Sequence, residues 1–207
     1  MILSSAHDRY SRQMLDALMA GNSDRAHGVA VEAFDHGLSL IDLLDDVLAP
    51  ALCVVGERWQ EGLVRHTQER IATAAAESLL ERLTARTPPP DAPLWLVATV
   101  RGDDHRIGVR MATATLADAG LRVRAAYGLH PADLVAEAPA LAGLCLSCSG
   151  PWSVVDARSA AAQVAAAGTP VLLGGRGWGE WEGAAGITRV PSMAALASLA
   201  APQTTTA

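Results

Sequence analysis

The fold class of the second half of the chain is decided at residues 94–108, which read LWLVATVRGDDHRIG. A short apolar run gives way to a polar loop, and a stretch with helical spacing follows at once. This alternation repeats to the end of the chain. The expected strands are 94–99, 121–127, 142–147, 170–173 and 187–190, and the expected helices are 108–119, 131–138, 153–167 and 191–200. Strands alternating with helices predict an α/β domain over 94–207, with a doubly wound, Rossmann- or flavodoxin-like parallel sheet of five strands.

Residues 1–87 have a different periodicity. Apolar side chains recur there every three or four positions, as in an amphipathic helix. The pattern is broken at three glycines, Gly21, Gly37 and Gly62. Four helices joined by short turns predict a four-helix bundle, in which Pro50 is expected to kink or split the third helix. The run PPPDAP at 88–93 cannot continue a helix and is expected to be a stiff linker between the two domains.

Composition narrows the class of protein. The 207 residues carry a net charge of −6 with scattered basic residues, so no nucleic-acid partner is expected. An odd count of three cysteines argues against a disulfide framework and favours the cytoplasm. The sequence lacks both a secretory signal pattern and an apolar run of about 18 residues, so no membrane association is expected.

Polar and small residues follow three of the expected strands, at the edge where parallel sheets bind their ligands. They are Asp103 and His105 after the first strand, Ser147 and Ser149 after the third, and Gly174 and Gly175 after the fourth. A metal-ligating imidazole normally donates its other N–H to a carboxylate, so Asp103 and His105 form a candidate ligand pair, with Ser147 extending the relay. Each element also has an ordinary interpretation, as a solvated loop, a helix cap or a turn.

The order Asp103-x-His105-x-x-Gly108, Ser147, then Gly174-Gly175 resembles the signature of cobalamin-binding domains. These occur in methionine synthase, corrinoid methyl-transfer proteins, adenosylcobalamin mutases and light-sensing regulators of the CarH type. Ser149 departs from the pattern, which more often has Leu or Thr there. The resemblance implies a base-off, His-on complex in which His105 is the lower ligand of cobalt.

The same resemblance implies roles for the neighbouring residues. Asp103 and Ser147 would orient the imidazole, and Gly108, Gly174 and Gly175 would line a channel for the nucleotide tail. A larger side chain at Gly175 is then expected to block the cofactor and leave the fold intact. Two further sets of residues are assigned by position: Trp152, Trp178 and Trp181 as covers for corrin edges, and Cys145 and Cys148 as packing and loop residues.

The helical half resembles the cap of the CarH-type photoreceptors, in which a Trp, nine residues and then Glu-His occur. Here Trp59 is followed by nine residues and Glu69, but Arg70 stands in place of the His. The resemblance implies that Trp59 packs against the upper ligand and that Glu69 hydrogen-bonds a 5′-deoxyadenosyl group. His66, one helical turn before Glu69, is a further candidate. The ordinary alternative is a core Trp59 and a surface Glu69.

These features favour a cobalamin-binding sensor that responds to light by a change of conformation or assembly. Adenosylcobalamin is favoured over methylcobalamin as the cofactor. No catalytic residue is assigned. No DNA-binding module is recognised in the sequence, so the output requires a separate regulatory protein or a change of homo-oligomer. The alternatives are a corrinoid methyl carrier serving a methyltransferase, and a cobalamin store. The photoreceptors carry His directly after the cap Trp, whereas this chain has Gln60, which leaves water or His66 to take the upper site after illumination.

Overall fold

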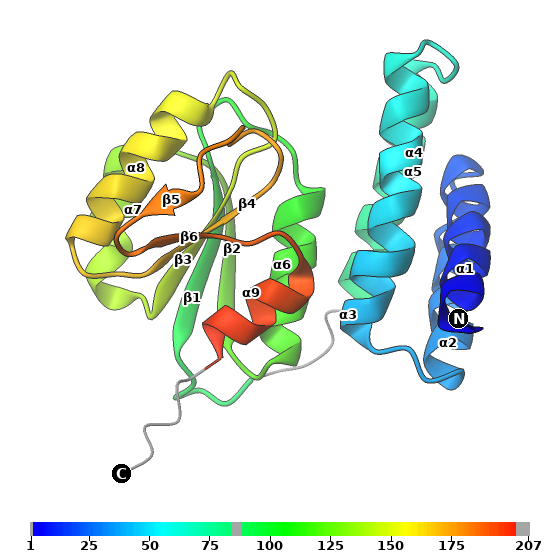
Figure 1. Cartoon of the computed structure of the whole chain (residues 1–207), viewed down its shortest axis with the longest axis horizontal. Coiled ribbons are helices and arrows are strands. Elements are labelled where there is room, and N and C mark those ends of the chain that lie inside the picture. Colours follow the sequence, from blue (N-terminus) through cyan, green and yellow to red (C-terminus); the bar gives the residue numbers. More distant parts are fainter. Residues whose placement is uncertain (1, 84–87, 202–207) are drawn as a thin grey trace. The chain divides into compact units, whose positions relative to one another are not determined.

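The first half of the chain forms helices, two of which begin at side-chain caps. In the computed structural model, which describes residues 2–83 and 88–201, Asn22 accepts a hydrogen bond from Arg25 N–H, and Ser39 and Asp42 form a reciprocal capping box. The elements are α1 (Ile2–Met19), α2 (Ser23–Asp35), α3 (Leu40–Asp42), η1 (Leu43–Leu48), α4 (Ala49–Gln60) and α5 (His66–Leu83) (Figure 1). Because α3, η1 and α4 follow one another without a gap, four helical segments result, and the predicted helical cap is confirmed.

The expected break at Pro50 takes the form of a change in hydrogen bonding. The segment η1 is a π-helix that ends two residues before Pro50, which occupies the first turn of α4. The backbone stays helical across this junction, with φ −75° and ψ −48° at Leu48. Proline lacks an N–H and disfavours the ordinary α turn before it, so the wider π turn lets the helix continue.

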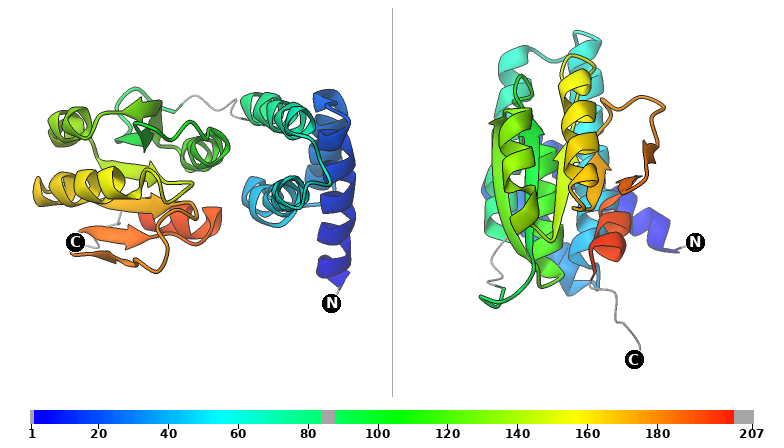
Figure 2. Two further views of the ribbon diagram at one scale, coloured as in Figure 1. Left: turned by 90° about the horizontal axis from the view of Figure 1, so that it is seen from above. Right: turned by 90° about the vertical axis from the view of Figure 1, so that its left-hand side faces the viewer.

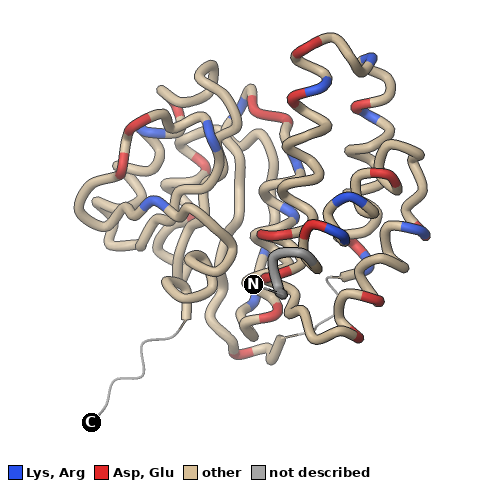
Figure 3. The backbone as a smooth tube through the Cα atoms, turned by 45° about the vertical axis from the view of Figure 1, so that its right-hand side comes forward, with Lys and Arg blue, Asp and Glu red and all other residues tan. Residues whose placement is uncertain are grey.

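Packing of apolar side chains stabilises this unit. Its largest fully buried side chains come from α1, η1 and α5 and include Tyr10, Met14, Leu18, Leu44, Leu48, Leu79 and Leu80. Acidic and basic residues are interspersed along the helices (Figure 3), and Arg82 pairs with Asp24 at 2.7 Å. Within the described residues, no helix has the length and apolar character needed to cross a membrane.

The second unit is a sheet covered on both faces by helices (Figures 1 and 2). Its strands are β1 (Leu94–Val100), β2 (Arg122–Leu129), β3 (Gly143–Ser147), β4 (Val171–Gly174), β5 (Gly183–Ala184) and β6 (Ile187–Arg189). Its helices are α6 (Ile107–Asp118), α7 (Pro131–Glu137), η2 (Ala138–Ala140), α8 (Val154–Ala166) and α9 (Met193–Ala200). The strand order is β2-β1-β3-β4-β6-β5, so the predicted doubly wound parallel sheet is confirmed.

The described sheet has one strand more than the sequence predicts. The two-residue β5 pairs antiparallel with β6 across a tight turn at Ala185 and Gly186. The helices fall into two layers, because α7 packs on α8 over one face and α6 packs on α9 over the other. By contacts the chain divides into two units, Met1–Ala85 and Arg86–Ala207.

Candidate cobalamin site

Strand register brings the three predicted loops to one edge of the sheet. Thr99 of β1 lies opposite Ser147 of β3, and Ser147 lies opposite Gly174 of β4. The chain leaves all three parallel strands at the same level, so the loops that follow are neighbours. This edge lies where β1 has β2 on one side and β3 on the other, which is the topological switch point where open α/β sheets bind ligands.

The loop after β1 is fixed by a buried threonine. Thr99 Oγ1 donates to the carbonyl of Asp103 at 2.8 Å and accepts from Gly128 N–H at 3.0 Å. Asp103 N–H donates to the carbonyl of Val100 at 3.1 Å, which closes the turn. The position of Asp103 is therefore set by the sheet and by the end of β2.

The Asp103 carboxylate is completely buried and accepts four hydrogen bonds. Oδ1 accepts from the backbone N–H of His105 at 3.2 Å and from its ring Nδ1 at 2.9 Å. Oδ2 accepts from Ser149 N–H at 2.7 Å and from Ser153 Oγ at 3.3 Å. A buried charge is tolerated only when it is hydrogen-bonded, and four donors suit the ionised form.

This carboxylate determines which nitrogen of His105 is available. An ionised carboxylate only accepts, so the proton of the shared hydrogen bond belongs to Nδ1 of His105. Nε2 then carries the lone pair that a metal needs. The imidazole side chain is 60% exposed while its Asp103 partner is at 0%, so the ring is anchored at one edge and open to a ligand at the other.

The structure corrects the predicted relay. The hydroxyl that reaches Asp103 belongs to Ser153, at the start of α8, and not to Ser147. Ser147 is buried instead with its Oγ against Gly108, where an added Cβ would lie 3.1 Å away. Ser149 does contribute, through its backbone N–H. Sequence reasoning missed Ser153 because a serine just before a helix predicts a cap, although this one makes no capping hydrogen bond.

The three candidate channel glycines differ in what surrounds them. Gly175 has φ +95°, and a Cβ there would lie 2.3 Å from the carbonyl oxygen of Cys148. This glycine is therefore required by the protein's own packing, and the expectation that a larger side chain would leave the fold intact is wrong. A Cβ at Gly174 would meet no atom within 4 Å. Gly174 is thus the position from which a side chain can enter open space beside the loops.

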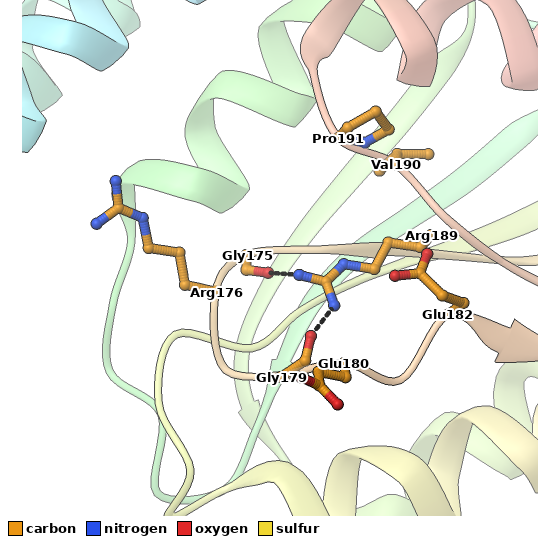
Figure 4. A pocket seen from close by; sticks show the side chains of 8 residues that line it. All are labelled: Gly175, Arg176, Gly179, Glu180, Glu182, Arg189, Val190 and Pro191. Atoms are coloured by element: carbon orange, nitrogen blue, oxygen red, sulfur yellow. Dashed lines mark hydrogen bonds between the residues drawn. The ribbon is translucent and has the colours of Figure 1, made fainter.

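A cavity of about 820 Å³ adjoins Gly175 (Figure 4). Its lining residues are Gly175, Arg176, Gly179, Glu180, Glu182, Arg189, Val190 and Pro191. The guanidinium of Arg189 donates to the carbonyls of Gly175 and Gly179, as the dashed lines of Figure 4 show, and so ties the two sides of this loop together. The cavity has room for part of a large ligand next to the Gly174-Gly175 pair.

The three tryptophans expected at corrin edges differ in exposure: Trp152 is exposed, Trp181 is partly buried and Trp178 is fully buried. Trp178 is fully buried, and its Nε1 donates to the Gly174 carbonyl at 2.7 Å, so the prediction for it is wrong. Trp181 packs against Trp178, with ring centroids 5.5 Å apart. Trp152 is 63% exposed and its ring lies 5.8 Å from that of His105. Cys145 and Cys148 are both buried, and burial raises the pKa of the Cys145 thiol to about 12.

In the helical unit, the three cap candidates lie together. The rings of Trp59 and His66 are 6.1 Å apart, and His66 Nδ1 lies 3.7 Å from a carboxylate oxygen of Glu69. Thr73 donates to the other Glu69 oxygen at 2.9 Å. Trp59 is 45% exposed, so it is not the core residue of the ordinary alternative. The turn between α4 and α5 thus presents an aromatic face, an imidazole and a carboxylate side by side.

The sequence and the fold of this chain are similar to those of known proteins. Residues 10–84 match the family described as B12 binding domain. The chain is 28% identical over 174 residues to the HTH-type transcriptional repressor CarH of Myxococcus xanthus. The aligned residues make up 81% of this chain and 58% of the repressor. The chain therefore spans little more than half the length of that relative. The monomethylamine corrinoid protein of Methanosarcina barkeri has the same fold, with a TM-score of 0.74 and 18% identity over 93% of this chain and 97% of that protein.

The residues at the sheet edge fit a corrinoid. A corrin ring supplies four nitrogen ligands to cobalt, so the protein needs to add one oriented nitrogen, and His105 Nε2 is such a nitrogen. The open space beside Gly174 and the cavity next to Gly175 suit a bulky tail. Residues 10–84 thus match the B12 binding domain family, the chain is similar to a CarH repressor, and it shares the fold of a corrinoid protein, all of which support cobalamin binding.

Proposed function

We propose that this protein is an adenosylcobalamin-binding sensor that changes conformation or assembly in light. The observation that carries the proposal is the grouping of Trp59, His66 and Glu69 at one turn of the cap, in a chain similar to the repressor CarH. Adenosylcobalamin supplies a cobalt–carbon bond that visible light breaks. The residues described above bind the cofactor, orient it and respond to that change.

His105 is the proposed lower ligand, with Nε2 toward cobalt. Asp103 holds the ring through Nδ1, and Ser153 and the Ser149 N–H hold Asp103 in turn. Because the carboxylate is buried, its charge acts on the imidazole in a medium that screens it poorly, and this strengthens the imidazole as a donor. Gly174 is proposed to line the path of the nucleotide tail, where the absence of a side chain leaves room.

The cap residues are proposed to recognise the upper ligand. Trp59 offers a large, half-exposed apolar face, which suits a flat purine better than a methyl group. Glu69 has one oxygen bonded to Thr73 and the other near His66, so it is oriented to accept hydrogen bonds from ribose hydroxyls. The output would pass to a separate regulatory protein or to a second copy of the chain, in the cytoplasm.

A methyl carrier for a corrinoid methyltransferase is the second candidate. The observation in its favour is the fold shared with the monomethylamine corrinoid protein over 97% of that protein's length. The two functions differ in what the protein does alone. A sensor responds to light without a partner protein. A carrier changes its bound cofactor only when a methyltransferase removes or adds the methyl group.

The deciding experiment loads the purified protein with adenosylcobalamin and, separately, with methylcobalamin. Absorption spectra and size-exclusion profiles are recorded in the dark and after green light. The sensor proposal expects tighter binding of adenosylcobalamin, and a change of elution volume or helix content on illumination. If the loaded protein bleaches as free cofactor does and its size and helix content stay constant, the sensor proposal fails and the carrier is favoured.

A further inference from the structure

The loop between β3 and α8 places an exposed tryptophan against the candidate metal ligand. The Trp152 and His105 rings have centroids 5.8 Å apart and planes inclined at 33°. Both side chains are largely exposed, at 63% for Trp152 and 60% for the His105 side chain. A large aromatic ring in such an exposed position is unusual unless something covers it.

The position of Trp152 is prepared by its own loop. The indole ring folds back over Gly150, where a Cβ would lie 2.0 Å from the ring carbons. Gly150 is packed in turn against Gly177 of the loop after β4, since a Cβ at Gly177 would lie 2.7 Å from Gly150 N. Ser153, which follows Trp152 in the sequence, donates a hydrogen bond to the Asp103 carboxylate. One short loop therefore holds the Asp103 carboxylate through Ser153 and places the Trp152 ring beside the His105 imidazole.

From this arrangement we infer that Trp152 is a positioning residue for the cobalt ligand. Asp103 fixes one edge of the imidazole, but a single hydrogen bond leaves an exposed ring free to swing about it. The neighbouring indole ring supplies the second constraint, which reduces the conformational freedom that His105 loses when Nε2 binds a metal. It also offers flat apolar surface beside the imidazole. The inference rests on the proposed cobalamin function and assigns to Trp152 a role in the fixed orientation of His105.

The test compares Trp152→Ala with Trp152→Phe in the full chain. Trp152→Ala is expected to weaken cobalamin binding about 3- to 10-fold and to lower the fraction that shows the His-on spectrum, and Trp152→Phe to restore both, because aromatic contacts contribute on this scale. Val155→Ala is the matched control, since Val155 is 74% exposed near the same end of α8 and should change neither. Wild-type affinity and spectrum in Trp152→Ala would overturn the inference.

A second measurement needs no cofactor. In the NMR spectrum of the apo protein, the His105 ring protons should carry an upfield ring-current shift that is lost in Trp152→Ala and kept in Trp152→Phe. If Trp152→Ala does not fold, Trp152→Leu against Trp152→Phe replaces it, and equal binding by those two would overturn the inference. If wild-type protein binds cobalamin without a His-on spectrum, the proposed lower ligand is wrong and this role falls with it.

Discussion

Asp103 Oδ1 lies 2.9 Å from Nδ1 of His105, in a pair whose carboxylate is completely buried and whose imidazole is 60% exposed. The buried carboxylate is held by the strand edge and by the loop before α8, so it fixes the Nδ1 edge of the exposed imidazole. This asymmetry is what a metal ligand requires, because the donor nitrogen has to meet a ligand while its orientation is set from behind. The first two predictions follow from it.

His105→Ala should abolish the His-on spectrum of bound cobalamin. Asp103→Asn should act more mildly, with a loss of affinity of about 10- to 100-fold, because the imidazole remains but its orientation and basicity are no longer supported. The measurements are absorption spectra and binding titrations. Melting temperatures are needed beside them, since an amide at position 103 turns an N–H toward the buried donors of Ser149 or Ser153. An unchanged spectrum in His105→Ala would rule out this lower ligand.

Ser153→Ala should weaken cobalamin binding more than Ser147→Ala does. Ser153 Oγ donates to the Asp103 carboxylate at 3.3 Å, whereas Ser147 Oγ faces Gly108. Loss of one hydrogen bond to a buried charge is expected to cost about 1.5–3 kcal/mol, part of it in folding stability. Titration and thermal unfolding of both variants separate the two contributions. Equal effects of the two substitutions would show that Ser147 supports His105 as much as Ser153 does, and would contradict the role assigned to Ser153.

Gly174→Val and Gly175→Ala should have opposite consequences. A Cβ at Gly174 meets open space, so the apo protein should melt close to the wild type while cobalamin binding is lost. Gly175→Ala should lower the free energy of unfolding by about 1–3 kcal/mol, because φ is +95° and the Cβ meets a carbonyl oxygen. Cobinamide, which lacks the nucleotide, should bind Gly174→Val as it binds the wild type. If cobinamide is excluded as well, Gly174 does not line a tail path.

His66→Ala should leave the spectrum of the illuminated protein unchanged. His66 is 65% exposed and is placed between the Trp59 ring and the Glu69 carboxylate, so moving to cobalt would cost both contacts. Gln60 carries an amide, which is a poor ligand for this metal, so water is the expected occupant. Spectra of illuminated wild type and variant decide. A spectrum typical of two imidazole ligands that disappears in His66→Ala would show that His66 is recruited.

Burial of Cys145 predicts a loss of stability at alkaline pH. Its pKa is raised from 9.0 to about 12, so the folded protein holds the thiol neutral while the unfolded chain ionises. This contribution is complete below pH 9 and is lost as pH rises between 9 and 12. Relative to Cys145→Ala, the wild type should lose about 1.4 kcal/mol between pH 8 and 10. Denaturant unfolding at the two pH values measures it, and a constant difference between the proteins would contradict the cause given.

The sequence by itself determined the features that depend on local order. A period of three to four in residues 1–87 and short apolar runs in 94–207 are enough to predict helices and a parallel sheet, because side-chain burial imposes those periods. The strand ends also located Asp103 and His105, since a parallel sheet gathers the loops at its carboxyl edge. The extra strand β5 was missed because it has only two residues and so shows no period.

The tertiary structure alone decided which atoms meet at that edge. Ser147 and Ser153 are six residues apart and equally polar, and only the path of the turn between β3 and α8 brings Ser153 to Asp103. Gly174 and Gly175 are identical in sequence terms, yet one faces open space and the other a carbonyl. Trp152 and Trp178 are likewise the same residue type, yet one is exposed and the other is fully buried. Periodicity is a property of neighbours along the chain, whereas hydrogen bonds and steric contacts at a site join residues whose distance is fixed by folding.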